Sequence, residues 1–432
     1  MKRPLLSVRS CDALAFVSFI CFSTFGQHID RHAIVALGGW AFAGRHAELP
    51  GRLKTDSAIL FARDYQKPIS PAKDYLVKLV CESSDQIVTV RFGTAGARIE
   101  KTTTTKLLQS DISGPHGIAF APDRKSYFVS MGHGRPYGTA VKYDAADDRA
   151  VGQVQLGMFP ATADVSPDGN FLFVVNFNLH GDPVPSSVSV VDTNMMMEIA
   201  RIPTCVMPHG SRITQDGTRQ YSACMMSDLL VEIDARKLKA SRSFRVSKGK
   251  EEGFDVLPKD VRETSEMPGM NHSNPHEAAP GQRSDSCQPT WAQPSVDGNS
   301  VYVACNKSDD IVEIDTLRWT MARRIPAGSG VYNLAVTPDG KLLVATNKRG
   351  PSVSIFELGS GKELARLLTK RKIVHGVAIS PDNHYAFVTV EGIGSEPGTL
   401  EVIDLAALKT VAELDVPPQA AGIDFWKTEP SR

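Results

Sequence analysis

Short apolar segments separated by polar turns recur through most of the chain. In each unit an apolar strand leads into Pro-Asp-Gly or a related turn, and a second apolar strand follows it. Because Asp and Gly both tolerate positive φ, an Asp-Gly turn between two apolar runs predicts a β-hairpin. The turn aspartates are Asp123, Asp168, Asp216, Asp297, Asp339 and Asp382.

The spacing of these turns indicates a repeated unit. Successive turn aspartates are 45, 48, 81, 42 and 43 residues apart, and the value of 81 corresponds to one repeat plus an insertion of similar length. Each hairpin is followed by a third strand such as SVSVVDTN and a fourth such as MEIARIP. Four short strands per repeat, without helical segments, predict an all-β propeller in which each repeat forms one blade.

Seven blades account for residues 75–426. Six of them begin near Pro115, Pro160, Pro208, Pro289, Val331 and Val374. The remaining blade, numbered one, is split: its inner strand is residues 421–425 and its outer strands begin at Tyr75. Sharing one blade between the N- and C-terminal strands closes the ring and removes free sheet edges. We therefore expect a single seven-bladed β-propeller domain, followed by a tail over residues 427–432.

Residues 1–43 have the pattern of an export signal. Lys2 and Arg3 precede two apolar stretches, residues 13–25 and 33–43, each shorter than the ~20 residues that span a bilayer. The second stretch ends in Ala41-Phe42-Ala43, which matches a signal peptidase site. The alternative is a retained membrane anchor. After cleavage, residues 44–74 form an extended N-terminal segment, and we expect a periplasmic or secreted protein without a stable membrane span.

Charge and sequence motifs narrow the choice of partner and cofactor. The chain has 48 Lys and Arg residues and 48 Asp and Glu residues, so its formal net charge is zero. A nucleic-acid-binding protein normally carries a basic face, so we expect no nucleic acid partner. The sequence contains no Cys-x-x-Cys-His motif, which excludes covalent c-type haem.

The repeats resemble a known family. The segments VSPDGNFLFVVN, VTPDGKLLVATN and ISPDNHYAFVTV, each with the S-V-x-V-x-D type strand that follows, are similar to the YVTN-type seven-bladed propellers. These propellers are similar to the haem-d1 domain of nitrite reductase and to the amine dehydrogenase heavy chain. The resemblance implies the fold of residues 75–426, and such propellers have binding, lactonase and redox roles alike.

Alignment of the blades by their turn aspartates places a first ring of residues at one mouth of the central channel. This ring lies seven positions before each turn and reads, from blade one to blade seven, Ala421, His116, Ala161, His209, Thr290, Tyr332 and His375. Imidazoles that face a shared channel suit a metal ion or an anionic ligand. The alternative is that His-Gly simply fits this turn. Trp291, next to Thr290, either walls the same ligand pocket or packs between blades.

A second ring lies at the end of each second strand and contains three cysteines. It reads Cys81, Met131, Asn176, Cys224, Cys305, Thr346 and Val390. Cys205 and Cys287 precede the inner strands of blades four and five, so these two cysteines gather with Cys224 and Cys305 in one sector. The four cysteines form one or two disulfides in an oxidising compartment, or they supply soft ligands to a metal ion.

An insertion over residues 248–286, between blades four and five, adds further soft ligands to that sector. It is polar and rich in Pro, Gly and Ser, so we expect a loop. Its Met and His residues resemble the tracts of exported copper-handling proteins, because thioether and imidazole groups suit copper. The candidate metal ligands are His209, Cys224, Cys305, Met267, Met270, His272 and His276. The alternative is a solvated loop.

These observations favour an exported, non-enzymatic propeller that binds a copper ion or a cofactor at the channel mouth. The expected ligand-binding residues there are His116, His209, His375, Tyr332 and Trp291. Two other functions stay open. One is a lactonase-like or redox-associated enzyme of the amine dehydrogenase or cytochrome d1 class, and the other is a propeller that binds another exported protein without a small ligand.

Overall fold

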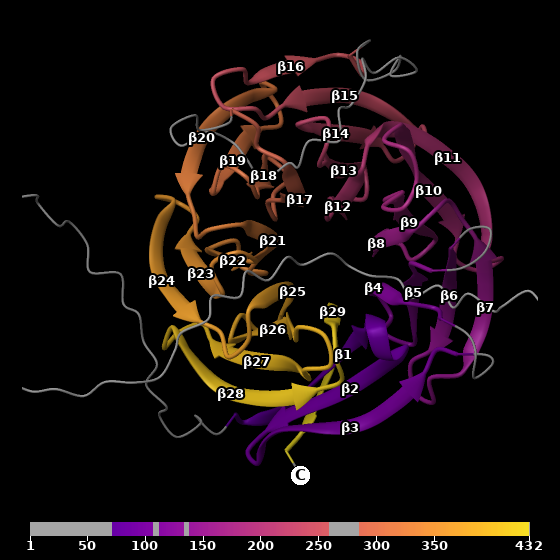
Figure 1. The fold of residues 1–432 in the computed structure, drawn as a ribbon, viewed down its shortest axis with the longest axis vertical. Coiled ribbons are helices and arrows are strands. Elements are labelled where there is room, and N and C mark those ends of the chain that lie inside the picture. Colours follow the sequence, from indigo (N-terminus) through magenta and orange to yellow (C-terminus); the bar gives the residue numbers. More distant parts are fainter. Residues whose placement is uncertain (1–70, 107–111, 134–137, 259–284, 432) are drawn as a thin grey trace, which may run out of the picture. The chain divides into compact units, whose positions relative to one another are not determined.

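The computed structural model describes residues 71–106, 112–133, 138–258 and 285–431. The expected export signal, most of the 44–74 segment, and Met267, Met270, His272 and His276 lie outside these described residues. The described part forms seven β-sheets arranged in a ring (Figure 1), and the predicted all-β seven-bladed propeller is confirmed. None of the helices in this part is long and apolar enough to span a membrane.

Each sheet begins with an inner strand at the channel and continues outward to the rim. Blade one comprises β29 (Ala420–Pro430), β1 (Lys73–Cys81), β2 (Gln86–Gly93) and β3 (Gly96–Thr104), and blade two comprises β4 (Pro115–Phe120), β5 (Ser126–Met131), β6 (Thr139–Asp144) and β7 (Ala150–Gln155). Blade three comprises β8 (Pro160–Val165), β9 (Phe171–Asn176), β10 (Pro185–Asp192) and β11 (Met197–Val206).

The remaining blades follow the same order. Blade four comprises β12 (Pro208–Ile213), β13 (Arg219–Cys224), β14 (Leu229–Asp234), β15 (Lys239–Arg245) and β16 (Glu252–Phe254), and blade five comprises β17 (Pro289–Pro294), β18 (Ser300–Cys305), β19 (Asp310–Asp315) and β20 (Thr320–Pro326). Blade six comprises β21 (Val331–Val336), β22 (Leu342–Asn347), β23 (Ser352–Glu357) and β24 (Lys362–Leu368), and blade seven comprises β25 (Ile373–Ile379), β26 (Tyr385–Glu391), β27 (Gly398–Asp404) and β28 (Lys409–Val416).

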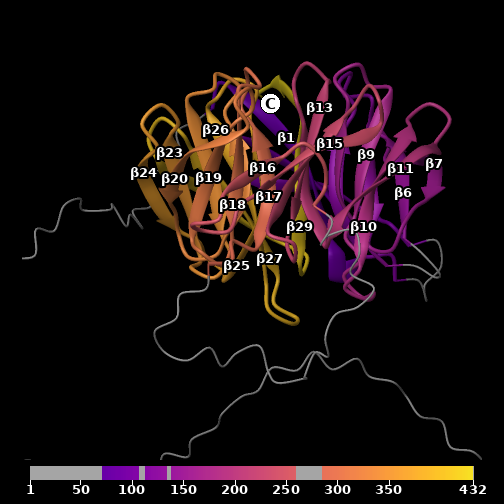
Figure 2. The same ribbon diagram turned by 90° about the horizontal axis from the view of Figure 1, so that it is seen from above.

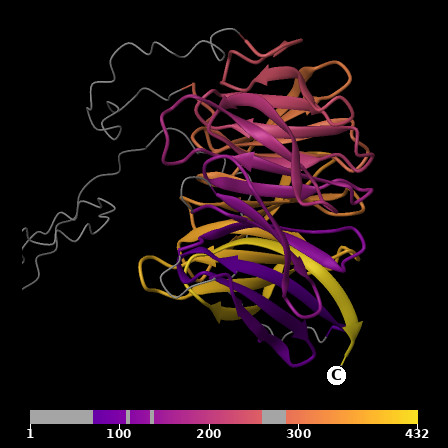
Figure 3. The same ribbon diagram turned by 90° about the vertical axis from the view of Figure 1, so that its right-hand side faces the viewer.

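The inner strands form a closed circle around the channel. Each of them contacts the inner strand of the next blade, and β29 contacts both β25 and β4. Edge-on views show the sheets standing side by side around one axis (Figures 2 and 3). Apolar side chains fill the space between neighbouring blades, as where Tyr221 and Phe244 of blade four cluster with Val303 and Val312 of blade five. This packing makes the inner strands a rigid frame for the channel mouth.

The two ends of the chain share blade one, as the turn spacing predicts. β1 pairs antiparallel with β29 from Lys73, opposite Pro430, to Cys81, opposite Ala420. Because β29 reaches Pro430, the expected tail over 427–432 is wrong, and most of it is strand. The buried Arg91 accounts for the extra length, since its guanidinium donates to Asp74 at 3.1 Å and to Glu429 at 2.9 Å.

Three residues of the insertion, β16, form a strand where a loop was expected, while the other described residues of the insertion are turns or irregular. β16 pairs antiparallel with β15 and becomes the fifth strand of blade four. An outermost strand offers unpaired N–H and C=O groups along its edge, and β16 satisfies part of that edge. Glu251, directly before β16, accepts a hydrogen bond from Arg324 of blade five at 2.8 Å. The insertion therefore ties blade four to blade five.

Candidate functional site

Four side chains from the starts of inner strands meet at one mouth of the channel. They are His116 of β4, His209 of β12, Tyr332 of β21 and His375 of β25. The ring of His116 lies 5.4 Å from that of His375 and 6.1 Å from that of His209, measured between ring centroids. The Tyr332 ring lies 5.4 Å from His209 and 5.1 Å from His375. The structure thus brings together the four residues that the first ring predicts.

The glycine after each of these histidines is required by close packing of the inner strands. A Cβ atom added to Gly117, Gly210 or Gly376 would lie 2.2–2.6 Å from a backbone oxygen of the next inner strand. That separation is shorter than van der Waals contact, so only glycine fits. The glycine of each His-Gly pair therefore serves the fold, while the histidine side chain faces the channel.

His209, Tyr332 and His375 form a hydrogen-bonded chain. Nδ1 of His209 lies 2.9 Å from the Thr290 carbonyl oxygen and must donate to it, so Nε2 accepts a hydrogen bond from the Tyr332 hydroxyl at 3.0 Å. The same hydroxyl lies 3.4 Å from Nε2 of His375. Burial, with a smaller effect from the nearby His116, lowers the pKa of His209 to about 3. Burial and the Lys348 charge hold the pKa of His375 well below its ordinary value, so both imidazoles are neutral at pH 7.

Glu82 holds His116 through a direct hydrogen bond. The carboxylate comes from the 3-10 turn Glu82–Ser84 that follows β1, and its Oε2 lies 2.8 Å from Nδ1 of His116. The other oxygen, Oε1, lies 3.6 Å from Nε2 of His133. Burial alone would raise the pKa of Glu82, but the contacts with His116 and His133 outweigh it and lower the pKa to about 2. Glu82 is therefore ionised at neutral pH, and it accepts the Nδ1 proton of His116.

Lys348 supplies a positive charge on the blade-six side of the mouth. Its Nζ lies 4.3 Å from the ring centroid of Tyr332 and 3.3 Å from Oε1 of Glu391. Burial opposes the charged form, but Tyr332 and Glu391 outweigh burial and raise the pKa of Lys348. The ammonium group is therefore protonated at neutral pH. Its neighbour Arg349 is paired with Asp309 at 2.5 Å.

A pocket of about 430 Å³ opens over these residues at the channel mouth. Its outer lining comes from the residue at the end of, or directly after, the second strand of six blades: Glu82, Phe177, Met225, Asn306, Lys348 and Glu391. The predicted second ring lies one residue too early in most blades, and two too early in blade six, and therefore misses Glu82 and Lys348. Because side chains alternate along a strand, a one-residue step exchanges a side chain that faces a neighbouring blade for one that faces the channel. Charged residues directly after an apolar second strand are the sequence signal that identifies Glu82 and Lys348.

Trp291 does not line the mouth pocket, which corrects its predicted place there. It borders a smaller cavity of about 30 Å³ further along the channel, together with Arg212. The Trp291 ring lies 6.2 Å from that of His209, and the Arg212 guanidinium lies 4.7 Å from the Trp291 ring centroid. Trp291 follows Thr290 on β17 and is thus one step further from the mouth.

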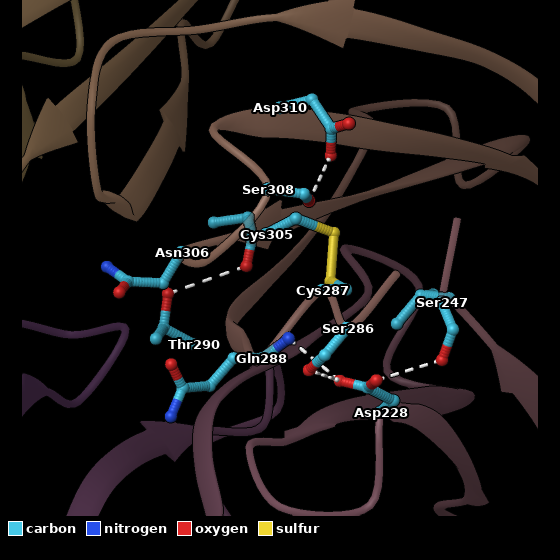
Figure 4. Close-up of a disulfide and its surroundings, with 12 residues drawn as sticks. Asp228, Ser247, Ser286, Cys287, Gln288, Thr290, Cys305, Asn306, Ser308 and Asp310 are labelled. Carbon is cyan, nitrogen blue, oxygen red and sulfur yellow. Dashed lines mark hydrogen bonds between the residues drawn. A yellow bond between two sulfur atoms is a disulfide. The ribbon is translucent and has the colours of Figure 1, made fainter. Parts of the chain in front are cut away.

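The four clustered cysteines are paired in two disulfides. Cys205 of β11 is bonded to Cys224 of β13, which joins blade three to blade four, and Cys287 is bonded to Cys305 of β18. Beside the second disulfide, the Asp228 carboxylate accepts hydrogen bonds from Ser247, Ser286 and the backbone N–H of Gln288 (Figure 4). Cys81, at the equivalent place in blade one, is a buried thiol, and burial raises its pKa to about 12.

The disulfides correct the prediction that Cys224 and Cys305 bind a metal, because a disulfide sulfur is not a thiolate ligand. Among the residues that the structure describes, no group of three or more His, Cys, Asp or Glu side chains is arranged to hold a metal ion. Both ring nitrogens of His209 are engaged, by Thr290 and Tyr332. The copper prediction now concerns Met267, Met270, His272 and His276 alone, which lie outside the described residues, and it stays a prediction.

Comparison with known proteins shows the fold. No protein-family model matches the chain, and no curated relative matches it by sequence. Among solved structures, the periplasmic gluconolactonase of Pseudomonas aeruginosa matches with a TM-score of 0.59 and 17% identity, over 82% of this chain and 99% of that chain. A proposed 6-phosphogluconolactonase of Bacteroides fragilis matches with a TM-score of 0.59 and 15% identity, over 82% of this chain and 98% of that chain.

A third structure with the same fold has a different activity. Kuenenia stuttgartiensis hydrazine synthase matches with a TM-score of 0.53 and 20% identity, over 76% of this chain and 90% of that chain. At such low identity these similarities establish the propeller and not the chemistry. The function must therefore be inferred from the residues at the channel mouth.

Proposed function

We propose that the mouth pocket hydrolyses a lactone, with His116 as the general base and Lys348 as the cation that stabilises the developing oxyanion. The observation that carries this proposal is the 2.8 Å contact between Glu82 Oε2 and His116 Nδ1. A carboxylate on Nδ1 orients the imidazole, fixes its tautomer and leaves Nε2 free to accept a proton. His116 and Lys348 line the same pocket, so both face one bound ligand.

Water is the only co-reactant in this mechanism. Nε2 of His116 takes a proton from water while the water oxygen bonds to the lactone carbonyl carbon, and the carbonyl oxygen becomes an oxyanion next to Lys348. The carbonyl then re-forms, the ring C–O bond breaks, and His116 returns the proton to the leaving oxygen. The product is an open-chain hydroxy acid, which releases its carboxylic proton to solvent. No covalent bond to the protein is formed.

The charges of the pocket support these roles at neutral pH. The lowered pKa of Glu82 keeps a negative charge beside His116, where it stabilises the imidazolium that forms when His116 accepts a proton. The raised pKa of Lys348 keeps a positive charge for the oxyanion. Because His209 and His375 are neutral, they do not repel that imidazolium.

Three further observations support the wider context of this proposal. The two disulfides support an exported protein, because disulfides persist in oxidising compartments. The repeated turn and strand segments support membership of the YVTN-type family. Two of the structural neighbours are named for lactone hydrolysis, which supports the reaction class by analogy of fold.

The direct test is a lactone panel. Protein beginning at residue 44, produced in an oxidising compartment, is incubated with aliphatic and sugar lactones, and acid release is followed in weakly buffered solution. We expect at least one lactone to open faster than in buffer, and His116→Asn to lower kcat by about 10²- to 10⁴-fold. His384→Asn is the matched control, because the His384 side chain is 65% exposed and lies outside the pocket lining. No acceleration with any lactone, or an undiminished rate in His116→Asn, would contradict the proposal.

Ligand binding without turnover is a second candidate, favoured by the chain of His209, Tyr332 and His375. These three side chains already bond to one another and to backbone, which suits a static wall better than a proton relay. Calorimetry with the lactones of the panel separates the two functions. Saturable binding without acid release supports the binding role, whereas acid release that depends on His116 supports hydrolysis.

A further inference from the structure

The pocket at the channel mouth has two chemically different walls. Blades one, six and seven supply the charged residues Glu82, Lys348 and Glu391, whereas blades three and four supply Phe159, Phe177, Leu179 and Met225. Figure 1 shows that β9 of blade three lies across the ring from β22 of blade six. The apolar wall begins directly at the imidazoles, since the Phe159 ring lies 5.6 Å from His116 and the Phe177 ring 4.8 Å from His209.

Phe159 occupies a backbone position that favours glycine. In six blades the residue directly before the inner strand, here called the pre-strand position, has positive φ: Gly114, Phe159, Met207, Gln288, Gly330 and Gln419. Blades two and six have glycine there, which takes this conformation without steric cost. Phe159 has φ 48°, a region that is unfavourable for a bulky residue.

Because Met207, Gln288 and Gln419 share this backbone conformation, what distinguishes Phe159 is its aromatic ring, which lines the mouth pocket. The Phe159 ring is 3% exposed and packs against Phe177, whose ring centroid lies 5.9 Å away. Leu179 extends the same wall toward solvent and is 41% exposed. The exposed Leu179 and the two buried rings of Phe159 and Phe177 thus form an apolar surface at the pocket rim, which suits an apolar part of a ligand.

We infer that the pocket takes a lactone that carries an apolar substituent, with the ester group between His116 and Lys348 and the substituent against Phe159, Phe177 and Leu179. This inference rests on the proposed lactone hydrolysis and adds the substrate class. A sugar lactone fits less well, because its hydroxyl groups would lose water against the aromatic wall without finding hydrogen-bond partners there. On the charged wall, Lys348 already contacts Glu391 and Glu82 contacts His116.

The test compares three lactones with wild type and variants. γ-Nonalactone carries a pentyl substituent, γ-butyrolactone carries none, and glucono-δ-lactone carries hydroxyl groups. Each methylene buried against an apolar wall strengthens binding about fourfold, so partial burial of the pentyl chain predicts a kcat/KM at least about tenfold above that of γ-butyrolactone. Leu179→Ser and Phe159→Gly should each reduce this ratio several-fold. Ile393→Ser, which removes a 48% exposed apolar side chain outside the pocket lining, should leave the ratio unchanged.

A binding measurement separates failure of this inference from failure of the proposed hydrolysis. The probes are 5-pentyl-2-pyrrolidinone and unsubstituted 2-pyrrolidinone, which are lactams that resist hydrolysis, and their Kd values are measured by calorimetry. If no lactone is opened but the pentyl lactam binds more tightly and Leu179→Ser weakens it, the hydrolysis proposal is wrong and the ligand class holds. Equal Kd values for both lactams, or a higher kcat/KM for glucono-δ-lactone than for γ-nonalactone, would overturn the inference. Leu179→Ser keeps the test valid if Phe159→Gly fails to fold, because the Leu179 side chain is exposed.

Discussion

The carboxylate of Glu82 lies 2.8 Å from Nδ1 of His116, so a residue of blade one orients a side chain of blade two. Glu82 follows β1, and β1 is held in place by pairing with the C-terminal strand β29. Closure of the ring by the two ends of the chain therefore also positions the proposed general base. Disturbing that closure should affect activity as well as stability.

The first prediction concerns the charge of Glu82. Glu82→Gln should lower kcat for lactone hydrolysis by about 10²-fold with a smaller change in KM, because an amide neither fixes the His116 tautomer nor stabilises the imidazolium. Steady-state kinetics measure both constants. Glu396→Gln makes the same chemical change on an exposed loop and should keep the wild-type kcat. A wild-type kcat in Glu82→Gln would show that Glu82 does not support the base.

The second prediction concerns stability in acid. The pKa of His209 is about 3 in the folded protein and 6.5 in the unfolded chain, and the pKa of His375 is lowered in the same direction. Below pH 6.5 the unfolded chain therefore binds protons that the folded protein does not, and the free energy of unfolding falls as the pH falls. Each histidine contributes roughly 1 kcal/mol per pH unit over the range in which only the unfolded chain is protonated.

Denaturant unfolding between about pH 6.5 and 5 tests this dependence before carboxylates begin to titrate. The slope of unfolding free energy against pH should be smaller in His209→Gln and in His375→Gln than in wild type, whatever their stability at pH 7. His384→Gln, with its exposed ring, should retain the wild-type slope. Equal slopes in all four proteins would contradict the assignment of neutral, buried imidazoles.

The third prediction concerns the disulfides. Cys205 and Cys224 are 19 residues apart in sequence, and Cys287 and Cys305 are 18 residues apart. Closing loops of this size restricts the unfolded chain and stabilises a protein by about 3 kcal/mol for each disulfide. The double substitution Cys205→Ser with Cys224→Ser should lower the free energy of unfolding by about that amount in denaturant titrations. Reductant should destabilise wild type but have no effect on a variant in which all four of these cysteines are serine.

The fourth prediction concerns a buried ion pair between blades one and two. Nζ of Lys78 lies 2.6 Å from Oδ1 of Asp148, and both side chains are 1% exposed. Asp148→Asn leaves the ammonium buried without its main partner and should lower the free energy of unfolding by about 3 kcal/mol. Asp148 has φ 61°, which Asn tolerates equally well, so the backbone adds no strain.

A surface pair provides the control for this variant. Asp234 is bonded to the exposed Lys237 at 3.0 Å, and Asp234→Asn should change the free energy of unfolding by less than about 1 kcal/mol. Thermal or denaturant unfolding of the two variants compares them directly. Similar, small losses in both would show that the Lys78–Asp148 pair is not required for stability.

Sequence repetition predicts some parts of the site well and others poorly. The positions of the turn aspartates place His116, His209, Tyr332 and His375 in one ring, because each lies seven residues before a turn with a defined backbone conformation. The same alignment misses Glu82 by one residue and Lys348 by two. Strand ends shift by a residue from blade to blade, and side-chain alternation turns that small shift into a change of direction.

The hairpins, the number of blades, the blade shared by the two chain ends and the ring of histidines all follow from local patterns that repeat along the chain. The hydrogen bond between Glu82 and His116 joins residues 34 positions apart on different blades. The packing of neighbouring blades likewise decides which cysteines pair, how Lys348 contacts Tyr332, and how the charged wall of the pocket is separated from the apolar wall. The packing of the blades depends on many weak contacts distributed over the whole ring, so it cannot be predicted from any short stretch of sequence.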